Sequence, residues 1–300
     1  MNVYHSLKEA SLNPDIRNLA LGFFDGLHLG HREVIAGNGV RTMLSFKEHP
    51  QTVLFRDRPV TLITGLPHKQ DILENWKVPN IILLPFNKDV SLKSPDLFLS
   101  ELHLAFPFLE SIRVGENFRF GHQRAGNPHL LGEWGVTKKI RIEVIPSLLD
   151  QGSCVSSSRI RQLLAERELD AAATLLGRPY SLYGRVVEGQ KVGRKLGFPT
   201  LNLATEDGQL LPLGVYHGRV LLSHTFYKAA INIGKRPTLG SGCDIWVEAH
   251  LPGFSGDLYG QRINLEISGF IRDEIHFSSL DQLQKQIEQD VLSIKALPLC

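Results

Sequence analysis

Apolar and polar positions follow one pattern in the first part of the chain. Short apolar runs that predict strands cover Leu19 to Phe23, Thr42 to Phe46, Ile81 to Leu84, Ser111 to Val114 and Ile140 to Val144. Between them, Lys69 to Trp76 and Pro95 to Ala105 have the spacing of helices, and Ser94 before Pro95 is typical of a helix start. Strands that alternate with helices predict an α/β domain with a parallel sheet.

A different pattern begins after Tyr180. The run from Ser158 to Leu176 predicts a helix that ends at Gly177 and Pro179. Short alternating segments follow, at Tyr183 to Val187, Gly214 to Leu222, Tyr227 to Ile233, Ile245 to Leu251 and Arg262 to Phe270. They predict an all-β domain, an antiparallel barrel, and so two domains at residues 1–178 and 179–300. A terminal helix on the barrel is predicted by Leu280, Leu283, Ile287, Val291 and Ile294.

Composition narrows the classes of protein. The chain has 300 residues, 42% of them hydrophobic, which suits two cores of ordinary size. Its 33 Lys and Arg against 31 Asp and Glu leave a formal charge of +2, so nucleic acid is disfavoured as a partner. No segment resembles a leader or a membrane span, and no obligatory protein partner is evident. Cys154, Cys243 and Cys300 are widely spaced, which favours free thiols and a cytoplasmic location.

The segment Leu19 to His31 carries the strongest chemical signal. An apolar strand is broken at Asp25-Gly26, and a helix is predicted to start near Gly30. The N-terminus of a helix attracts phosphate, and His28 and His31 flank Gly30 at a spacing that lets both imidazoles reach one triphosphate. Metal ligation and ordinary loop histidines are the alternatives. The surrounding strand, acidic turn and helix favour a nucleotide site.

Two further motifs of the first half suit the same site. Gly115 to Gly121 alternates polar and aromatic residues between glycines, which is typical either of a loop holding a planar ring or of a turn with two packed phenylalanines. Val155 to Arg161 brings hydroxyls and two arginines to a helix start, where both can meet phosphate.

The second half has its own set of polar motifs. Glycines from Gly184 to Gly197 permit a loop over phosphate, and Lys191 adds positive charge. Thr200 and Asn202 place a hydroxyl and an amide oxygen on one side of an extended segment, as a hard cation requires, and a polar barrel edge is the alternative. Glu248 is a single carboxylate on a predicted strand, either solvated or catalytic.

These motifs together resemble the bacterial bifunctional riboflavin kinase/FAD synthetase family. The first half is similar to its adenylyltransferase module, which implies a Rossmann-like nucleotidyltransferase domain. The resemblance implies that His28 and His31 are catalytic and hold ATP phosphates, and that Asn117 and Phe118 lie at the flavin nucleotide, with magnesium near Asn117. It also implies ATP or phosphate contacts for Gly22, Phe24, Asp25, Gly30, Ser157, Ser158 and Arg161.

The second half is similar to the riboflavin kinase module of that family. The run Gly-Phe-Pro-Thr-x-Asn, ending at Asn202, resembles its magnesium and ATP motif. The resemblance implies that Thr200 and Asn202 position Mg²⁺ and the γ-phosphate, that Gly193 and Lys191 contact ATP, and that Arg272 lies near the flavin. Glu248 matches the proposed general base, which accepts the proton of the ribityl 5′-hydroxyl.

Two departures from the family pattern lie in the first half. Only ten residues separate His31 from Thr42, which predicts a helix cut to about two turns. Lys47 also replaces a residue of the usual pattern before His49-Pro50, near the expected flavin site.

The main prediction is therefore an enzyme with two activities. It phosphorylates riboflavin with ATP to FMN and then adenylylates FMN with ATP to FAD, releasing pyrophosphate, with Mg²⁺ assisting both steps. The alternative keeps the kinase and makes the N-terminal domain a degenerate, non-catalytic module. A third hypothesis is a flavin-binding regulator or carrier without turnover.

Overall fold

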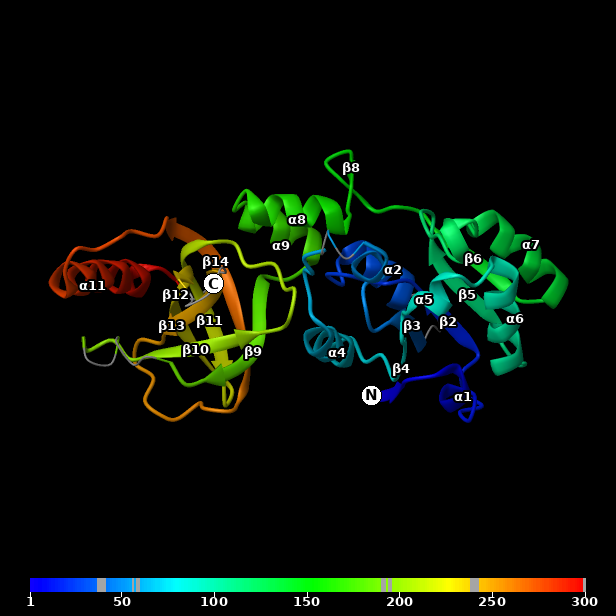
Figure 1. Cartoon of the computed structure of the whole chain (residues 1–300), viewed down its shortest axis with the longest axis horizontal. Helices are drawn as coiled ribbons and strands as arrows, with labels where there is room; N and C mark the ends of the chain where they lie inside the picture. Colours follow the sequence, from blue (N-terminus) through cyan, green and yellow to red (C-terminus); the bar gives the residue numbers. More distant parts are fainter. Residues whose placement is uncertain are drawn as a thin grey trace. The chain divides into compact units, whose positions relative to one another are not determined.

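The computed structural model describes the chain except residues 37–41, 56, 58–59, 190–192, 194–195, 238–242 and 299–300. It divides into two compact units, Met1–Ser157 and Ser158–Cys300 (Figure 1). Within the described residues, no helix has the length and apolar character needed to cross a membrane.

The first unit is built on a six-stranded parallel sheet in the order β1-β4-β3-β2-β5-β6. Its strands are β1 (Asn2–Tyr4), β2 (Asn18–Leu21), β3 (Thr42–Phe46), β4 (Asn80–Leu84), β5 (Ser111–Gly115) and β6 (Arg141–Ile145). Its helices are α1 (Leu7–Ala10), α2 (Leu29–Ala36), α3 (Pro50–Leu54), α4 (Leu66–Asn75), α5 (Lys88–Ser91), α6 (Pro95–Ala105) and α7 (Pro128–Lys138), with a 3-10 turn at His122–Arg124. The predicted parallel α/β domain is confirmed, and β1 is a strand that the sequence analysis missed.

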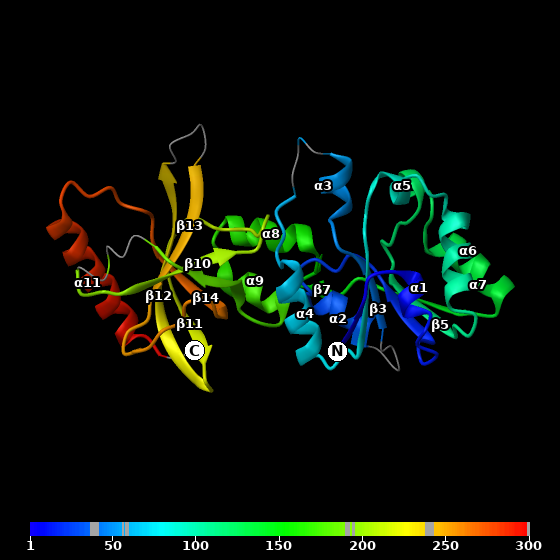
Figure 2. The ribbon, with the colours of Figure 1, turned by 60° about the horizontal axis from the view of Figure 1, so that its bottom comes forward.

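Helices cover both faces of this sheet. Successive residues of a strand point to opposite faces, so neighbouring apolar residues pack against different helices. Leu19 and Leu21 pack with α6 and α7, while Ala20 packs with α2 and α4. Figure 2 shows the two helix layers on either side of the sheet. The start of α6 is as predicted, since Ser94 accepts a hydrogen bond from the Leu97 amide at 3.2 Å. Helix α2 spans eight residues, which matches the expected two turns.

The second unit contains a closed antiparallel barrel in the strand order β10-β13-β12-β11-β14-β9, so the predicted barrel is confirmed. Its strands are β9 (Tyr180–Val187), β10 (Thr200–Thr205), β11 (Gly214–Leu222), β12 (Thr225–Pro237), β13 (Cys243–His250) and β14 (Arg262–Arg272). The terminal helix α11 (Leu280–Ala296) begins with Ser279 as its cap. Val291 and Ile294 are buried as expected, but Leu280 is 61% exposed and lies outside the packed face.

The segment between sheet and barrel differs from the expected single helix. It forms a short hairpin of β7 (Leu149–Asp150) and β8 (Ser153–Cys154), then α8 (Ser157–Ala165) and α9 (Leu169–Leu176). The two helices are separated at Arg167, which has a left-handed φ of 65° and pairs with Asp273 at 2.5 Å. Gly177 ends α9 in a left-handed conformation, as predicted. Both helices fall mainly within the second unit. The boundary between the two compact units therefore lies after Ser157, before the domain boundary expected at residue 178.

Candidate active sites

The turn after β2 lies where the order of the parallel strands reverses. β2 pairs with β3 on one side and β5 on the other, and both β2 and β5 continue into loops at their carboxyl ends. Ligands of open α/β sheets bind in the crevice at such a point. The backbone amide of Gly22 donates to the Leu44 carbonyl at 3.2 Å, which continues the contact with β3 to the start of the turn.

Backbone anchors hold this turn in an uncommon conformation. Phe24 and Leu27 have positive φ values of 56° and 42°, which non-glycine residues rarely adopt. The Asp25 carboxylate is 3% exposed and accepts backbone N–H bonds from Ile63 at 3.1 Å and Thr64 at 3.2 Å. Asp25, expected among the phosphate contacts, thus directs its carboxylate to the protein's own backbone. Phe24 is buried, with its ring edge against His31 at 5.3 Å.

His28 and His31 lie together at the start of α2. Their rings stack with centroids 3.5 Å apart and an interplanar angle of 19°. The His31 amide donates to Nδ1 of His28 at 3.3 Å. Because Nδ1 of His28 accepts, the proton of its neutral ring is on Nε2, which can then donate to a ligand. A Cβ at Gly30 would lie 3.3 Å from the His28 ring, so glycine leaves room for the stacked pair.

Lys69 is a residue of this region that the sequence analysis did not single out. It is 3% exposed on α4, and its Nζ donates to the Phe23 carbonyl at 2.7 Å. Burial lowers the pKa of Lys69 to about 8, while the nearby charge of Asp25 acts in the opposite direction. Its sequence context gave no signal, because a lysine in a helix is usually solvated.

The two other expected motifs of the first half are the segments 115–121 and 155–161. Asn117 follows β5 and donates from Nδ2 to Ser147 Oγ at 3.4 Å. Phe118 stacks on Phe120 with centroids 5.5 Å apart and packs against the core, which agrees with the alternative of a turn with packed phenylalanines. Ser157 Oγ donates to the Asp25 carbonyl at 2.8 Å, and Ser158 and Arg161 follow it on α8.

A cavity of about 510 Å³ lies in the first unit. Phe46 and Leu84, the last residues of β3 and β4, line it with Phe98 of α6. Lys93 also lines it, and pairs with Glu101 at 2.6 Å. This apolar space at the carboxyl ends of two strands was not predicted, because its lining comes from four separate segments.

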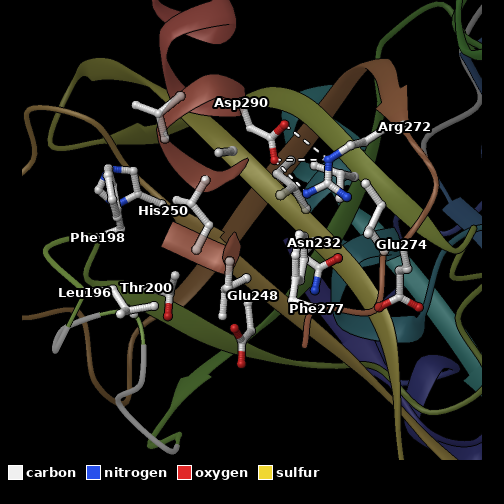
Figure 3. A pocket seen from close by; sticks show the side chains of 18 residues that line it. Leu196, Phe198, Thr200, Asn232, Glu248, His250, Arg272, Glu274, Phe277 and Asp290 are labelled. Atoms are coloured by element: carbon white, nitrogen blue, oxygen red, sulfur yellow. Dashed lines mark hydrogen bonds and ion pairs between the residues drawn. The ribbon is translucent and has the colours of Figure 1, made fainter. Parts of the chain in front are cut away.

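The second unit holds a cavity of about 340 Å³ between the barrel, the segment after β14 and α11 (Figure 3). Four of the predicted residues line it: Gly193, Thr200, Glu248 and Arg272. Thr200 is opposite His250 in the strand register, two residues from Glu248 along β13. The unpredicted lining includes Asn232, opposite Glu248 on β12, and Leu283 and Ile287 of α11.

Asn202 does not line this cavity but lies beside it. It is opposite Glu248 in the register and 4% exposed. Within the described part of the chain its Oδ1 has no hydrogen-bond partner. A Cβ at Gly189 would fall 2.1 Å from Nδ2 of Asn202, so only glycine permits this approach. Lys191, expected to contact ATP, lies outside the described residues.

Arg272 uses its charge to hold α11. Its Nη2 pairs with Asp290 Oδ2 at 2.7 Å and its Nε donates to both carboxylate oxygens at 3.2 Å, as the dashed lines in Figure 3 show. Gln286 donates to the same carboxylate at 3.0 Å. The side chains of Arg272 and Asp290 are 19% and 8% exposed, so this ion pair is largely removed from water. Arg272 therefore shapes the cavity wall.

A third cavity, of about 640 Å³, lies in the same unit. Phe254, Leu258 and Tyr259 contribute its apolar side, and Ser255 and Asp257 its polar side. Thr200 lines both this cavity and the one that contains Glu248. Thr200 thus lies between the cavity that contains Glu248 and the cavity lined by Phe254 and Asp257.

The comparisons with known proteins agree with this division of sites. The FAD synthetase family pattern matches residues 13–159 and the riboflavin kinase pattern matches residues 176–297. The chain is 34% identical to the bifunctional riboflavin kinase/FMN adenylyltransferase of Buchnera aphidicola subsp. Schizaphis graminum, over 97% of this chain and 96% of the relative. The Escherichia coli K12 protein of the same name is 33% identical over 97% and 95%.

A solved structure has the same fold over nearly the whole chain. It is a Streptococcus pneumoniae protein described as a macrolide-efflux protein, with a TM-score of 0.84, 25% identity and coverage of 99% of this chain and all of the other. Both family patterns and the full-length relatives point to one assignment. The chain belongs to the bifunctional riboflavin kinase/FMN adenylyltransferase family.

Proposed function

We propose that the chain makes FAD from riboflavin in two ATP-dependent reactions. The barrel transfers the γ-phosphoryl group of ATP to riboflavin, giving FMN and ADP. The first unit transfers the adenylyl group of a second ATP to FMN, giving FAD and pyrophosphate. The observation that carries the proposal is the position of Thr200 between two cavities, one of which contains Glu248.

For the kinase, we propose that riboflavin occupies the cavity with Glu248 and that the adenosine end of ATP occupies the larger one. Glu248 accepts the proton of the ribityl 5′-hydroxyl as its oxygen bonds to the γ-phosphorus, and the bond to the ADP oxygen breaks. Thr200 and Gly193 then lie where the phosphates pass. The apolar residues of α11 in the first cavity suit a flavin ring.

Magnesium fits the residues beside these cavities. The hydroxyl of Thr200 and the buried Oδ1 of Asn202, which has no partner among the described residues, are the oxygen donors that Mg²⁺ prefers. Bound there, the ion would neutralise charge on the phosphates. We propose these two residues as its protein ligands.

For the transferase, we propose that a phosphate oxygen of FMN bonds to the α-phosphorus of ATP while pyrophosphate leaves. No covalent enzyme intermediate is required, because alignment and charge stabilisation suffice. Nε2 of His28 and the ring of His31 donate to the triphosphate, with the amides of α2, Ser157, Ser158 and Arg161. Gly22, Phe24, Asp25 and Gly30 shape the turn, and Asn117 and Phe118 border the flavin nucleotide.

Two related proposals concern organisation and location. We propose residues 1–178 and 179–300 as the functional domains, since the riboflavin kinase pattern begins at residue 176. We also propose that the protein acts in the cytoplasm. The three widely spaced cysteines and the dependence on ATP support this location.

One assay tests the whole proposal. Riboflavin, ATP and Mg²⁺ are incubated with the protein, and riboflavin, FMN and FAD are followed together by chromatography. We expect FMN to rise first and FAD to follow with release of pyrophosphate, and chelation of Mg²⁺ to stop both. If FMN is formed but no FAD appears, even when FMN is supplied directly, the protein is a riboflavin kinase with a non-catalytic first unit. If neither FMN nor FAD is formed, the protein binds flavin without turnover.

A further inference from the structure

A buried ammonium group in the first unit has no part in the reaction described above. Lys69 lies on α4 and is 3% exposed, and its Nζ donates to the Phe23 carbonyl at 2.7 Å. Nζ also lies 4.2 Å from the centroid of the Phe23 ring. Burial of a charged amine costs free energy, and the buried positions of α4 around it include the apolar Ile72 and Leu73. Packing therefore does not explain why a charged lysine occupies position 69.

The contacts of Lys69 lead to the turn that carries the two histidines. The Phe23 carbonyl also accepts from Ser45 Oγ at 3.0 Å, so α4 and β3 hold the same peptide group. The next residues contain the positive φ values of Phe24 and Leu27, and such a conformation persists only when its surroundings fix it. Asp25 fixes the other side of the turn through the amides of Ile63 and Thr64. Lys69 contributes the one charge-assisted donor among these described anchors.

The titratable groups around Lys69 are few among the described residues. Asp25 supplies the opposing charge named above. The ring centroid of His49, which caps α3, lies 4.4 Å from that of Phe23, and His68 precedes Lys69 on α4 and is itself buried. Asp71, farther along α4, has its pKa raised by burial first and by Glu74 second. The pKa of Lys69 is about 8, so its charge changes within a pH range in which an enzyme can be assayed.

We infer that Lys69 is a positioning residue for adenylyl transfer, whose ammonium group holds the Phe23 carbonyl and thereby the turn that presents His28 and His31 to ATP. This inference rests on the proposed transferase activity of the first unit. The protonated amine makes a stronger hydrogen bond to a carbonyl than the neutral amine does. The turn is therefore held best below the pKa of Lys69.

The test compares Lys69→Met, which keeps length and removes charge, with Lys69→Arg, which keeps a charge at every accessible pH. Lys138→Met serves as the control, because Lys138 is an exposed lysine on α7 of the same unit. For each protein, FAD formation from FMN and FMN formation from riboflavin are measured from pH 6.5 to 9.5 at saturating substrates. The parent's FAD formation first establishes that the transferase exists.

We expect Lys69→Met to lower kcat for FAD formation by about 10- to 100-fold, the effect of a misplaced catalytic group, and to leave FMN formation unchanged. The parent should lose FAD formation as pH rises through about 8, and this alkaline loss should be absent in Lys69→Arg and in Lys69→Met. Lys138→Met should match the parent in both respects.

Three results would overturn the inference. One is a Lys69→Met protein with the parent's rate of FAD formation, and another is an alkaline loss that persists unchanged in Lys69→Arg. If Lys69→Met does not fold, the parent decides by itself, since constant FAD formation from pH 7 to 9.5 excludes a role for the charge. A parent that makes no FAD at any pH would instead refute the proposed transferase, and the role of Lys69 would fall with it.

Discussion

Single side chains in these sites divide into those whose charged groups hold the structure of the site and those whose position suits contact with a ligand. The Asp25 carboxylate accepts backbone amides and the Arg272 guanidinium is paired with Asp290, although both were expected to contact ligands. Each fixes a wall of its site. His28, with its Nε2 proton defined by the bond to Nδ1, and Glu248, on the surface of a cavity, have the geometry to act in the chemistry.

The histidine pair supports a prediction for the transferase. His28→Ala and His31→Ala should each lower FAD formation from FMN by about 10²-fold, because each removes a donor that stabilises charge on the transferring phosphates. FMN formation should be unchanged. The control is His129→Ala, since the side chain of His129 is 81% exposed on α7 of the same unit. FAD formation at the parent rate in either variant would contradict the role given to that histidine.

Glu248 and Thr200 support a second prediction, in which two substitutions differ in their response to magnesium. Glu248→Gln keeps the shape but removes the base, so we expect a lower rate of FMN formation at every Mg²⁺ concentration. Thr200→Ala removes a proposed oxygen ligand, so rising Mg²⁺ should restore part of its rate.

The measurement is FMN formation from riboflavin at saturating ATP over a titration of Mg²⁺. Thermal unfolding serves as the control for both variants and should change little. An unchanged rate in Glu248→Gln would remove Glu248 from the mechanism. Equal recovery of both variants by Mg²⁺ would mean that the two residues do not have separate roles.

At the scale of elements, local patterns predicted the sheet and the barrel. Strands β2 to β5 of the first unit are mostly buried and so appear as largely apolar runs, whereas β1 has only three residues and β6 has no buried residue. The break between α8 and α9 was not predictable, because it involves no glycine or proline and Arg167 contacts Asp273, 106 positions away. Long-range contacts also explain why Lys69, Asn232 and the lining residues of α11 were missed, whereas Thr200 and Glu248 stood in recognisable motifs.

Helix α11 supports a third prediction, since the ion pair of Asp290 with Arg272 joins it to β14 beside the cavity that contains Glu248. Asp290→Ala leaves Arg272 without its carboxylate in a largely buried position, which typically costs about 3 kcal/mol of unfolding free energy. Leu283, Ile287 and Val291 of the same helix line the cavity, so the KM for riboflavin should rise.

The measurements for this prediction are chemical unfolding and the KM for riboflavin. Glu288→Gln, at an exposed position of the same helix, serves as the control and should match the parent. FAD formation from FMN should not change, because the histidine pair of the proposed transferase site lies in the other unit. A parent-like KM in Asp290→Ala would show that the ion pair does not shape the riboflavin site.

At the scale of the whole molecule, the groups proposed for the two reactions lie in separately packed units, except Ser158 and Arg161 of the transferase, which follow Ser157 on α8. The sheet has its own hydrophobic clusters on its two faces, and the barrel is closed on itself. Each unit also has its own cavity or cavities and its own candidate groups for phosphate chemistry. A substitution that stops one reaction should therefore leave the other intact.

This independence supports the last prediction, in which two variants that each lack one of the two reactions together carry out both. Glu248→Gln should make FAD from supplied FMN but not from riboflavin, and His28→Ala should make FMN from riboflavin but little FAD. A mixture of the two, given riboflavin, ATP and Mg²⁺, should make FAD, because FMN released by one protein reaches the other through solution. The appearance of FAD should show a lag that shortens as the concentration of His28→Ala rises. If each variant keeps its own reaction and the mixture still makes no FAD, the barrel does not release FMN, and the two sites do not work as independent enzymes joined by a diffusing product.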